Sequence, residues 1–294
     1  MERREFLTKV TVAGLASLGG GALVAQDQPA QQPGESDVAY RTRLAQIRMA
    51  QTAQVARVMG DLQPRQYYEL RKYEIETEQQ KSGFDRFVAD AAIPALNRLG
   101  IGPVGVFCPQ EGISPIYVLM PHGSIESVNT LMERLMEDSE FLAKGSDFID
   151  APAGAPAYKN LEVSLHRAFE GMPRLERPTD APGRIFQLRI YESPSEKTGL
   201  KKIEMFNTAE IAIFRKVGLH PIFFGQTLAG AKMPNLTYML GFKDMEESRA
   251  AWKAFGGDPD WQRLRAMPEY ADRAILREKG ITNIYLKPAS YSQI

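Results

Sequence analysis

Arginine and tyrosine occur at the same spacing in two segments that read as β-strands. Arg71 and Tyr73 belong to the first segment, and Arg189 and Tyr191 belong to the second. Because side chains alternate between the two faces of a strand, each arginine shares a face with its tyrosine. A buried charge needs a partner, and a polar ligand is one such partner. These two pairs are therefore candidate ligand-binding residues.

The last strand-like segment of each half of the chain also has one aliphatic and one polar face. We expect the aliphatic faces to pack against helices and the polar faces to line the gap between two sheets. That gap is either a ligand site or a network of hydrogen bonds that joins the sheets, and the sequence leaves both open. The polar members in these last segments are Glu162, Ser164, His166, Asn283, Tyr285 and Lys287.

Two polar residues interrupt an apolar helical stripe in the second half of the chain. Asn207 and Glu210 fall on a stripe with 3-4-3-4-3 spacing. A carboxylate on a core face is costly unless it is paired. Glu210 is therefore expected either to form an ion pair, with Arg215 or Arg189, or to have a raised pKa and a chemical task.

The three histidines are His122, His166 and His220, and none lies four residues from another metal-ligand type on a helix. We predict no metal site and no cofactor. His220 begins a predicted strand and is an axial ligand in the alternative that a haem binds, an idea that follows from fold analogy alone. Cys108, the single cysteine, excludes an intrachain disulfide.

The charge balance excludes one class of function. Lys plus Arg total 36 and Asp plus Glu total 36, so the formal net charge is zero. A nucleic-acid-binding protein needs a basic surface that displaces counterions from phosphates, so we predict no nucleic-acid partner. The remaining composition, 44% hydrophobic and 24% charged, is typical of globular proteins.

The N-terminus has the pattern of an export signal. Arg3 and Arg4 precede an uncharged apolar stretch at 10–25 that is too short to span a bilayer. This pattern predicts a twin-arginine signal peptide at 1–25, cleavage after Ala25 and a periplasmic location. The alternative is an uncleaved signal that anchors the protein in the inner membrane. After removal of the signal, no other segment is long and apolar enough to span a membrane.

The rest of the chain divides into a linker, a leading helix and two similar halves. Residues 26–36 are rich in Gln and Pro and predict a disordered linker. Residues 37–60 predict an amphipathic helix that packs on its own domain or, alternatively, contacts a partner or a second copy. The predicted segments that follow are 67–168 for the first domain, 169–183 for a linker and 184–294 for the second domain.

The two halves repeat each other at an offset of 118–121 residues. Residues 68–74 match 186–192 at four of seven positions, and four further short matches follow in the same order. Each half reads strand, helix, strand, strand, helix, strand, which is the ferredoxin-like βαββαβ order. Such a unit leaves one sheet face bare, so we predict that the two faces meet in an eight-stranded barrel with helices outside.

Several segments of the second half resemble a NIPSNAP domain. The resemblance covers about 110 residues of that half and is looser in the first half, where the segment Leu-Arg-x-Tyr is kept but Asp-Pro-x-Trp is replaced. The segments that carry it are Gln187-Leu188-Arg189-Ile190-Tyr191-Glu192, Gly218-Leu219-His220-Pro221, Leu236-Thr237-Tyr238-Met239-Leu240, Ala251-Trp252-Lys253-Ala254-Phe255 and Asp258-Pro259-Asp260-Trp261. The whole chain is similar to exported tandem-NIPSNAP proteins of environmental bacteria.

The resemblance implies the dimeric α/β-barrel superfamily, which includes cofactor-free monooxygenases, haem-binding enzymes and binding proteins. It implies no agreed catalytic residue. We expect a module that binds a small molecule or a protein partner, in a chain that can also form a homo-oligomer. The alternative is a monooxygenase-like or haem-dependent enzyme with Arg189, Tyr191, Glu210 or His220 near the reacting centre. The candidate ligand-binding residues are Arg71, Tyr73, His166, Arg189, Tyr191, Asn207, Glu210, His220 and Tyr285.

Overall fold

The computed structural model of the chain describes residues 30–47 and 64–294, which belong to two separate units. In the first unit, residues 37–47 are helical. The hydroxyl of Ser36 accepts a hydrogen bond from the backbone N–H of Ala39, so it caps this helix as its residue type predicts. The predicted signal peptide at 1–25, its cleavage point and the end of the predicted leading helix at 60 lie outside the described residues.

The first half of the second unit follows the βαββαβ order, with both helical layers divided into shorter pieces. A π-helical segment at Phe87–Ala92 connects the first two helices. The elements are β1 Tyr67–Glu74, α3 Glu78–Arg86, α4 Ile93–Arg98, β2 Gly105–Pro109, β3 Ile116–His122, α5 Ile125–Asn129, α6 Leu131–Met136, α7 Ser139–Ile149 and β4 Asn160–Ala168.

The second half repeats this order, including a π-helical segment at Phe206–Glu210 in the matching place. Asp258 caps α11 by accepting hydrogen bonds from the backbone N–H groups of Asp260 and Trp261. The elements are β5 Ile185–Glu192, α8 Glu196–Met205, α9 Ile211–Lys216, β6 His220–Ala229, β7 Asn235–Phe242, α10 Met245–Gly257, α11 Pro259–Arg265, a 3-10 turn at Pro268–Tyr270, α12 Asp272–Ile275 and β8 Ile281–Pro288.

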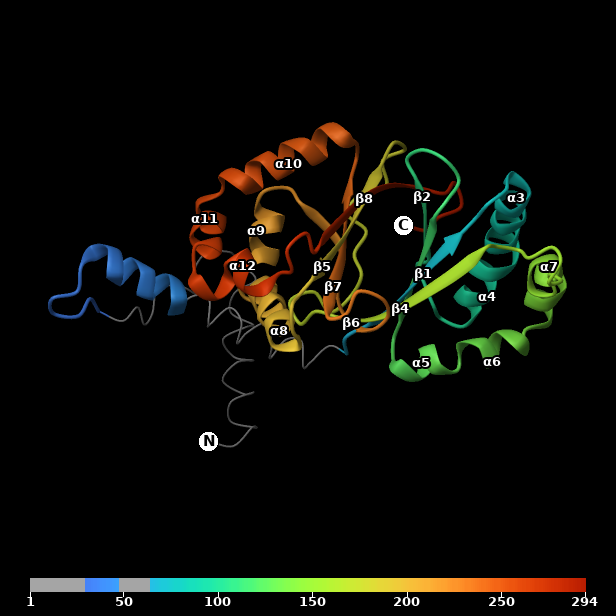
Figure 1. The fold of residues 1–294 in the computed structure, drawn as a ribbon, viewed down its shortest axis with the longest axis horizontal. Helices are drawn as coiled ribbons and strands as arrows, with labels where there is room; N and C mark the ends of the chain where they lie inside the picture. The colour runs from blue at the N-terminus through green and yellow to red at the C-terminus, as the bar shows by residue number, and fades with distance from the viewer. Residues whose placement is uncertain (1–29, 48–63) are drawn as a thin grey trace, which may run out of the picture. The chain divides into compact units, whose positions relative to one another are not determined.

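The eight strands of residues 64–294 close into one antiparallel barrel in the order β1-β3-β2-β8-β5-β7-β6-β4. Each half contributes four adjacent strands. The halves join at two seams, where Phe107 pairs with Pro288 and His166 pairs with Thr227. Figure 1 shows the helices of the two halves on opposite sides of these strands. The predicted fold, two ferredoxin-like halves in an intramolecular dimeric α/β-barrel, is confirmed.

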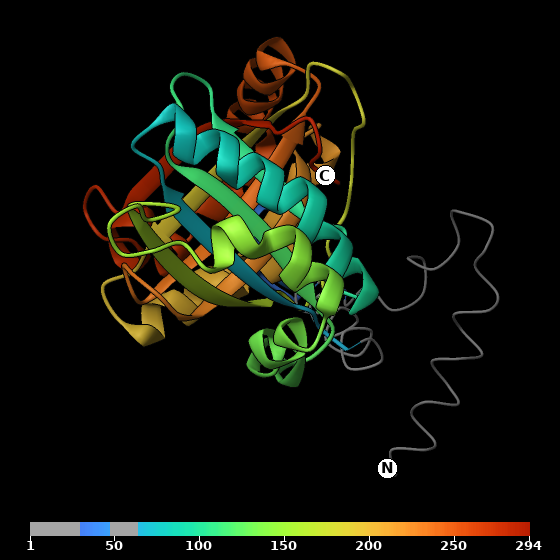
Figure 2. The same ribbon diagram turned by 90° about the vertical axis from the view of Figure 1, so that its right-hand side faces the viewer.

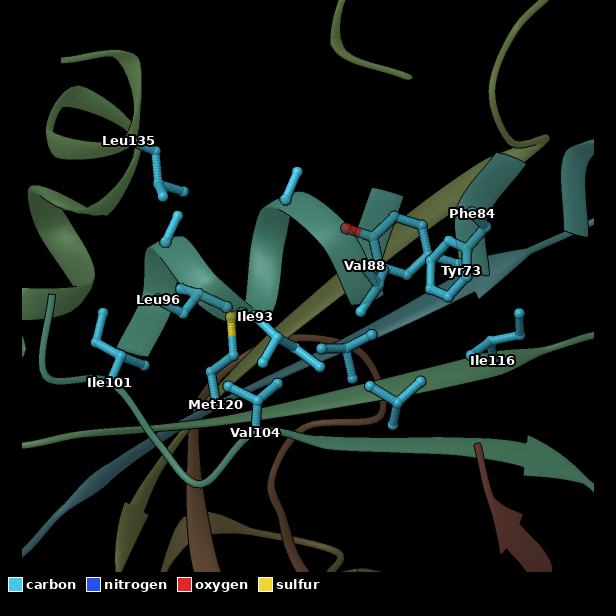
Figure 3. Close-up of a cluster of buried hydrophobic side chains, with 14 of the residues drawn as sticks. Tyr73, Phe84, Val88, Ile93, Leu96, Ile101, Val104, Ile116, Met120 and Leu135 are labelled. Atoms are coloured by element: carbon cyan, nitrogen blue, oxygen red, sulfur yellow. The ribbon is translucent and has the colours of Figure 1, made fainter. Parts of the chain in front are cut away.

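A first hydrophobic core lies between the strands and helices of the first half. Tyr73 of β1 packs edge-on against Phe84 of α3, and Val88, Leu96 and Met120 belong to the same cluster. Figure 3 shows these side chains converging from the helices onto the strands, and Figure 2 shows the same helices covering the sheet. This core covers the outer face of the strands of the first half.

A second hydrophobic core fills the barrel and takes side chains from both halves. Leu70 and Leu188 lie in it, together with Phe186, Phe223 and Met239. The predicted orientation of the first strands is therefore wrong, because their leucines point into the barrel and their Arg-Tyr pairs point under the helices. Both faces of each strand are buried, so polarity alone did not distinguish the barrel interior from the helix-covered face.

The predicted orientation of the last strand of each half is wrong for β8 but agrees with the structure for β4. In β8, Leu286 lies in the barrel core, so Tyr285 points under the helices, opposite to the prediction. In β4, Ser164 and His166 line a cavity inside the barrel, on the side that the sequence predicted. The difference arises because the two halves are no longer equivalent at the inner surface: β8 presents aliphatic side chains there, whereas β4 presents polar ones.

Candidate functional site

One end of the barrel interior holds a cavity of about 240 Å³. One part of its wall is aliphatic and comes from three strands, with Leu70 on β1, Leu188 and Ile190 on β5 and Ile284 on β8. Tyr117 of β3 adds one aromatic side chain. A cavity of this kind, apolar with a few convergent polar groups, is the usual form of a small-molecule site.

The polar groups of the cavity centre on His166. Its Nε2 lies 2.9 Å from the hydroxyl of Ser164, and its Nδ1 lies 3.0 Å from the hydroxyl of Thr227. The residue is 1% exposed. Burial lowers the pKa of His166 to about 3, so the imidazole is neutral near pH 7.

A glycine in the neighbouring strand makes room for this histidine. A Cβ at Gly225 of β6 would lie 2.7 Å from the Cβ of His166. No side chain can occupy that position without a displacement, so the barrel wall at this point is built around His166. The register shift between Leu165 and His166 in the β4–β6 pairing lies at the same place.

Beyond Thr227, the hydrogen-bonded chain continues to the turn between β6 and β7. The Thr227 hydroxyl donates to Oδ1 of Asn235 at 2.5 Å, and the Thr237 hydroxyl donates to the same oxygen at 3.2 Å. The amide nitrogen of Asn235 donates to the carbonyls of Ala231 and Lys232 at 3.0 and 3.1 Å. The polar cluster, defined as Ser164, His166, Thr227, Asn235 and Thr237, is therefore continuous.

Charged side chains surround the outer part of the cavity in mutually neutralising pairs. Lys72 lies 3.0 Å from Glu162 and 3.3 Å from Glu74. Lys232 lies 3.5 Å from Glu192 and donates a hydrogen bond to Thr282 at 2.8 Å. The rim therefore provides no excess of either sign that would select a strongly charged ligand.

The Arg189 and Tyr191 pair takes part in a network under the helices of the second half. The Arg189 guanidinium lies 4.6 Å above the Trp252 ring, and the Tyr191 hydroxyl lies 2.9 Å from that of Tyr238. Burial raises the pKa of Tyr238 well above its usual value. None of these four residues lines the barrel cavity; instead they connect the sheet to the helices that cover it.

Glu210 forms an ion pair, but with a partner that the sequence did not suggest. Its Oε2 lies 3.0 Å from the ammonium of Lys202, and both side chains are buried. Burial raises the pKa of Glu210, and the nearby Lys202 opposes that change. The predicted partner Arg215 instead pairs with Glu176 at 2.7 Å. Lys202 is missed because lysine is common on exposed helix faces and its burial depends on the tertiary structure.

The remaining candidates also lie away from the cavity. Arg71 donates a hydrogen bond to Glu69 at 2.6 Å. Asn207 accepts a hydrogen bond from the backbone of Gly171 at 2.9 Å, and Tyr285 lies 3.1 Å from the hydroxyl of Ser248. His220 begins β6 and is not among the cavity-lining residues. Of the nine candidates, only His166 lines the cavity.

Three members of the polar cluster were not singled out from the sequence. Asn235 and Thr237 are spaced two residues apart in β7, which places them on one face, but their neighbours carry no signal of a site. Thr227 meets His166 only because β4 pairs with β6 across the seam between the halves. Sequence alternation indicates the face of a strand, whereas strand pairing across a seam depends on barrel closure.

The two histidines give no support to haem ligation, because both ring nitrogens of His166 lie within hydrogen-bond distance of hydroxyl groups and His220 does not line the cavity. Within residues 30–47 and 64–294, no group of three or more His, Cys, Asp or Glu side chains is arranged to hold a metal ion. In the same two ranges, no helix combines the length and apolar character required to cross a bilayer.

A wider surface groove of about 870 Å³ lies outside the barrel, along α3, α7 and residues 150–157. Its walls include Arg86, Asp90, Lys144 and Phe148. None of these side chains belongs to a buried polar network, so the groove offers a ligand no prearranged hydrogen-bonding groups. The smaller barrel cavity is therefore the better candidate site.

Comparison with solved structures supports the fold over most of the chain. A candidate monooxygenase from Fusobacterium nucleatum superposes with a TM-score of 0.51 at 7% identity, covering 76% of this chain and 92% of its own. A second candidate monooxygenase, from Lactobacillus acidophilus, superposes with a TM-score of 0.50 at 8% identity. The superposition covers 76% of this chain and 94% of that protein. At these identities the similarity concerns the fold.

The second half of the chain matches a known family of domains. An uncharacterised NIPSNAP-like domain protein from Burkholderia xenovorans is 23% identical over 37% of this chain and 89% of its own, with a TM-score of 0.33. No curated protein matches the sequence. The NIPSNAP family model matches residues 186–293, which are β5 to β8 and the helices between them. The chain therefore contains a NIPSNAP domain, which forms the second half of its α/β-barrel.

Proposed function

We propose that the protein binds a small, largely apolar molecule in the barrel cavity. The observation that carries this proposal is a polar cluster, centred on the buried His166, beside the aliphatic part of the cavity wall. The members of the cluster are hydrogen-bonded to one another, and polar groups that converge on a cavity are typical of sites that orient a small molecule. The cluster is therefore best explained by a ligand that it orients.

A cavity-filling variant tests this proposal. Ile190→Trp introduces a large side chain at the cavity wall. Leu200→Trp is the matched control, because Leu200 lies on α8 and is 54% exposed. The expected result is that small aromatic probes such as nitrobenzene and p-nitrophenol bind to the wild type and to Leu200→Trp but not to Ile190→Trp. Calorimetry that detects no binding to the wild type, or equal binding to all three proteins, would contradict the proposal.

Native mass spectrometry of protein purified from its host complements this test. It reports a retained small molecule, a retained protein partner and the number of copies in one measurement. A retained mass that is absent from Ile190→Trp supports a ligand in the cavity. A retained protein partner with an empty cavity supports the other form of the binding module, in which the protein acts through interaction.

A monooxygenase-like oxidation is the second candidate function. It is supported by the fold, which is shared with candidate monooxygenases over 76% of the chain. A cavity that pairs an aliphatic wall with a hydrogen-bond acceptor can position an apolar substrate for oxidation. Oxygen uptake in the presence of phenolic substrates, abolished in Ile190→Trp and retained in Leu200→Trp, tests it.

We also propose that the protein is exported. The support is the sequence at the N-terminus, where Arg3 and Arg4 precede an apolar stretch. Replacing both arginines by lysine is expected to retain the full-length protein in the cytoplasm. A cleaved protein in the periplasm identifies residues 1–25 as a signal peptide, whereas an uncleaved protein in the membrane fraction identifies them as an anchor.

A further inference from the structure

The position of a single proton fixes the direction of the hydrogen bonds in the polar cluster. The amide nitrogen of Asn235 donates to two backbone carbonyls, so its Oδ1 faces Thr227 as an acceptor. A hydroxyl group has one proton to donate. Thr227 donates that proton to Asn235 and has only lone pairs left for His166.

The same reasoning determines the tautomer of His166. Nδ1 lies 3.0 Å from the Thr227 oxygen, which can only accept, so Nδ1 must carry the proton. A neutral imidazole has one protonated nitrogen, and Nε2 is therefore unprotonated. The hydroxyl of Ser164, 2.9 Å away, is positioned to donate to Nε2.

The row of hydrogen bonds ends at Ser164 and His166, on the side of the cavity. This end accepts a hydrogen bond in either orientation of the Ser164 hydroxyl. When Ser164 donates to Nε2, its oxygen presents only lone pairs to the cavity. Its other acceptor is the carbonyl oxygen of Leu70 at 3.3 Å. When Ser164 donates there, the lone pair of Nε2 becomes available instead. Both states accept a hydrogen bond from a ligand.

We infer that the barrel cavity recognises an uncharged O–H or N–H donor on a small apolar molecule, such as a phenol, and disfavours the corresponding anion. This inference rests on the proposed function and specifies its ligand chemistry. The acceptor end, formed by Ser164 and His166, offers no hydrogen-bond donor to an anionic oxygen. The donor of an uncharged ligand completes the chain Ser164, His166, Thr227, Asn235.

The other titratable groups that face the cavity do not change this preference. Lys72, Glu162 and Lys232 lie at the rim in ion pairs. Tyr117 lines the cavity, and Tyr68 lies opposite His166 in the β1–β4 pairing. Burial raises the pKa of both tyrosines, so both remain neutral at neutral pH. Among the described residues, no charged group lies at the inner end of the cavity to stabilise an anion.

The first arm of the test measures the tautomer directly. Long-range ¹H–¹⁵N correlations distinguish the protonated ring nitrogen of His166 from the unprotonated one. The expected result is a proton on Nδ1 in the wild type and in Thr227→Ser, which keeps the hydroxyl. Thr227→Val removes the acceptor, so the proton is expected to move to Nε2. A proton on Nε2 in the wild type would overturn the inference, whatever binds.

The second arm measures ligand choice by calorimetry with p-nitrophenol and p-nitroanisole, which share the nitrobenzene ring but differ in the O–H. The ratio of their association constants is expected to fall about fivefold in Thr227→Val, which loses the equivalent of one hydrogen bond to the ligand. In Thr227→Ser, the ratio is expected to stay within about twofold of the wild type. An unchanged ratio in Thr227→Val would overturn the inference and leave the proposed function intact.

The same probe reports its own charge. At a pH where free p-nitrophenol is half ionised, bound probe is expected to lose the phenolate absorption band. A stronger phenolate band in the bound state would contradict the inference. If neither probe binds to the wild type, the proposed function fails and the assignment of its ligand class fails with it.

Discussion

The ammonium of Lys202 lies 3.0 Å from the carboxylate of Glu210, and the two side chains are 1% and 2% exposed. In the first half of the chain, the positions 118 residues earlier hold Phe84 and Ala92. The ion pair thus occupies a place that an apolar pair fills in the other copy. Lys202 also lies 5.0 Å from the Phe206 ring, which adds a cation–π contact.

Replacing one partner of this ion pair should destabilise the folded protein. Lys202→Met leaves Glu210 buried without its counterion, and we expect a loss of about 3–5 kcal/mol in the free energy of unfolding. The double variant Lys202→Met/Glu210→Leu removes both charges and should recover most of that loss. Urea denaturation measures both values. Lys201→Met, which removes an exposed pair with Glu204, should cost less than about 1 kcal/mol.

The two outcomes separate a structural pair from a functional one. If the double variant is stable and still binds the cavity probes, the pair has only a structural role. A double variant as unstable as Lys202→Met would show that the neighbouring aromatic rings require the charge.

The stability of the protein should depend on pH through His166. Its pKa is about 3 in the folded protein and 6.5 in an unfolded chain, so between these values only the unfolded state binds the proton. Stability from this group is therefore complete above pH 6.5 and is lost as the pH falls toward 3. The full loss is roughly 4–5 kcal/mol, since one pKa unit corresponds to about 1.36 kcal/mol.

His166→Phe should flatten this dependence. Denaturation midpoints of the wild type and the variant, measured at several pH values between 6.5 and 4, give the two slopes. Parallel slopes would mean that His166 titrates near its ordinary pKa and is not desolvated in the barrel.

A single methyl group at Gly225 should disturb the cavity. In Gly225→Ala, the new Cβ would lie 2.7 Å from the Cβ of His166, so one of the two strands must shift. Overpacking of this kind costs about 1–3 kcal/mol. Gly256→Ala is the control, because Gly256 lies in helix α10 and a Cβ there meets nothing within 4 Å.

The control should even gain about 0.5–1 kcal/mol, because alanine is a better helix former than glycine. Thermal denaturation compares the two variants, and the ring resonances of His166 report any displacement. Equal stability of both variants, with unchanged His166 resonances, would contradict close packing at this position.

The buried carboxylate of Glu69 should contribute more to the free energy of unfolding than an exposed carboxylate does. It lies 2.6 Å from the guanidinium of Arg71 and 3.5 Å from His122. Burial opposes ionisation of Glu69, but these two partners lower its pKa below the usual value. Glu69→Gln leaves the buried Arg71 without its anion and should cost about 2–4 kcal/mol.

Glu162→Gln serves as the comparison, since its pair with Lys72 is half-exposed and should contribute less than about 1 kcal/mol. Denaturant unfolding measures both. The second half of the barrel already has Gln187 at the position of Glu69, where it accepts a hydrogen bond from Trp252. If Glu69→Gln unfolds like the wild type, a neutral amide satisfies Arg71 in the first half as well.

The architecture could be predicted from patterns within the sequence. The repeat offset and the alternation within each half predicted two βαββαβ units, and their bare sheet faces predicted closure into one barrel. These features are local, because the periodicity of a strand or a helix involves only residues that are close in sequence. The polar face of β4, with Ser164 and His166, was also predicted to point toward the gap between the sheets.

The face of each strand that points into the barrel, and the polar groups that come into contact, depend on the folded barrel and could not be predicted from the sequence. Leu70 and Leu188 fill the barrel while Arg71 and Arg189 lie under helices, because both faces are buried and each arginine finds its partners on the outer one. His166 meets Thr227 through strands that belong to different halves. Such contacts depend on how a closed barrel sets its register across the seams, and no pattern within a single strand encodes that register.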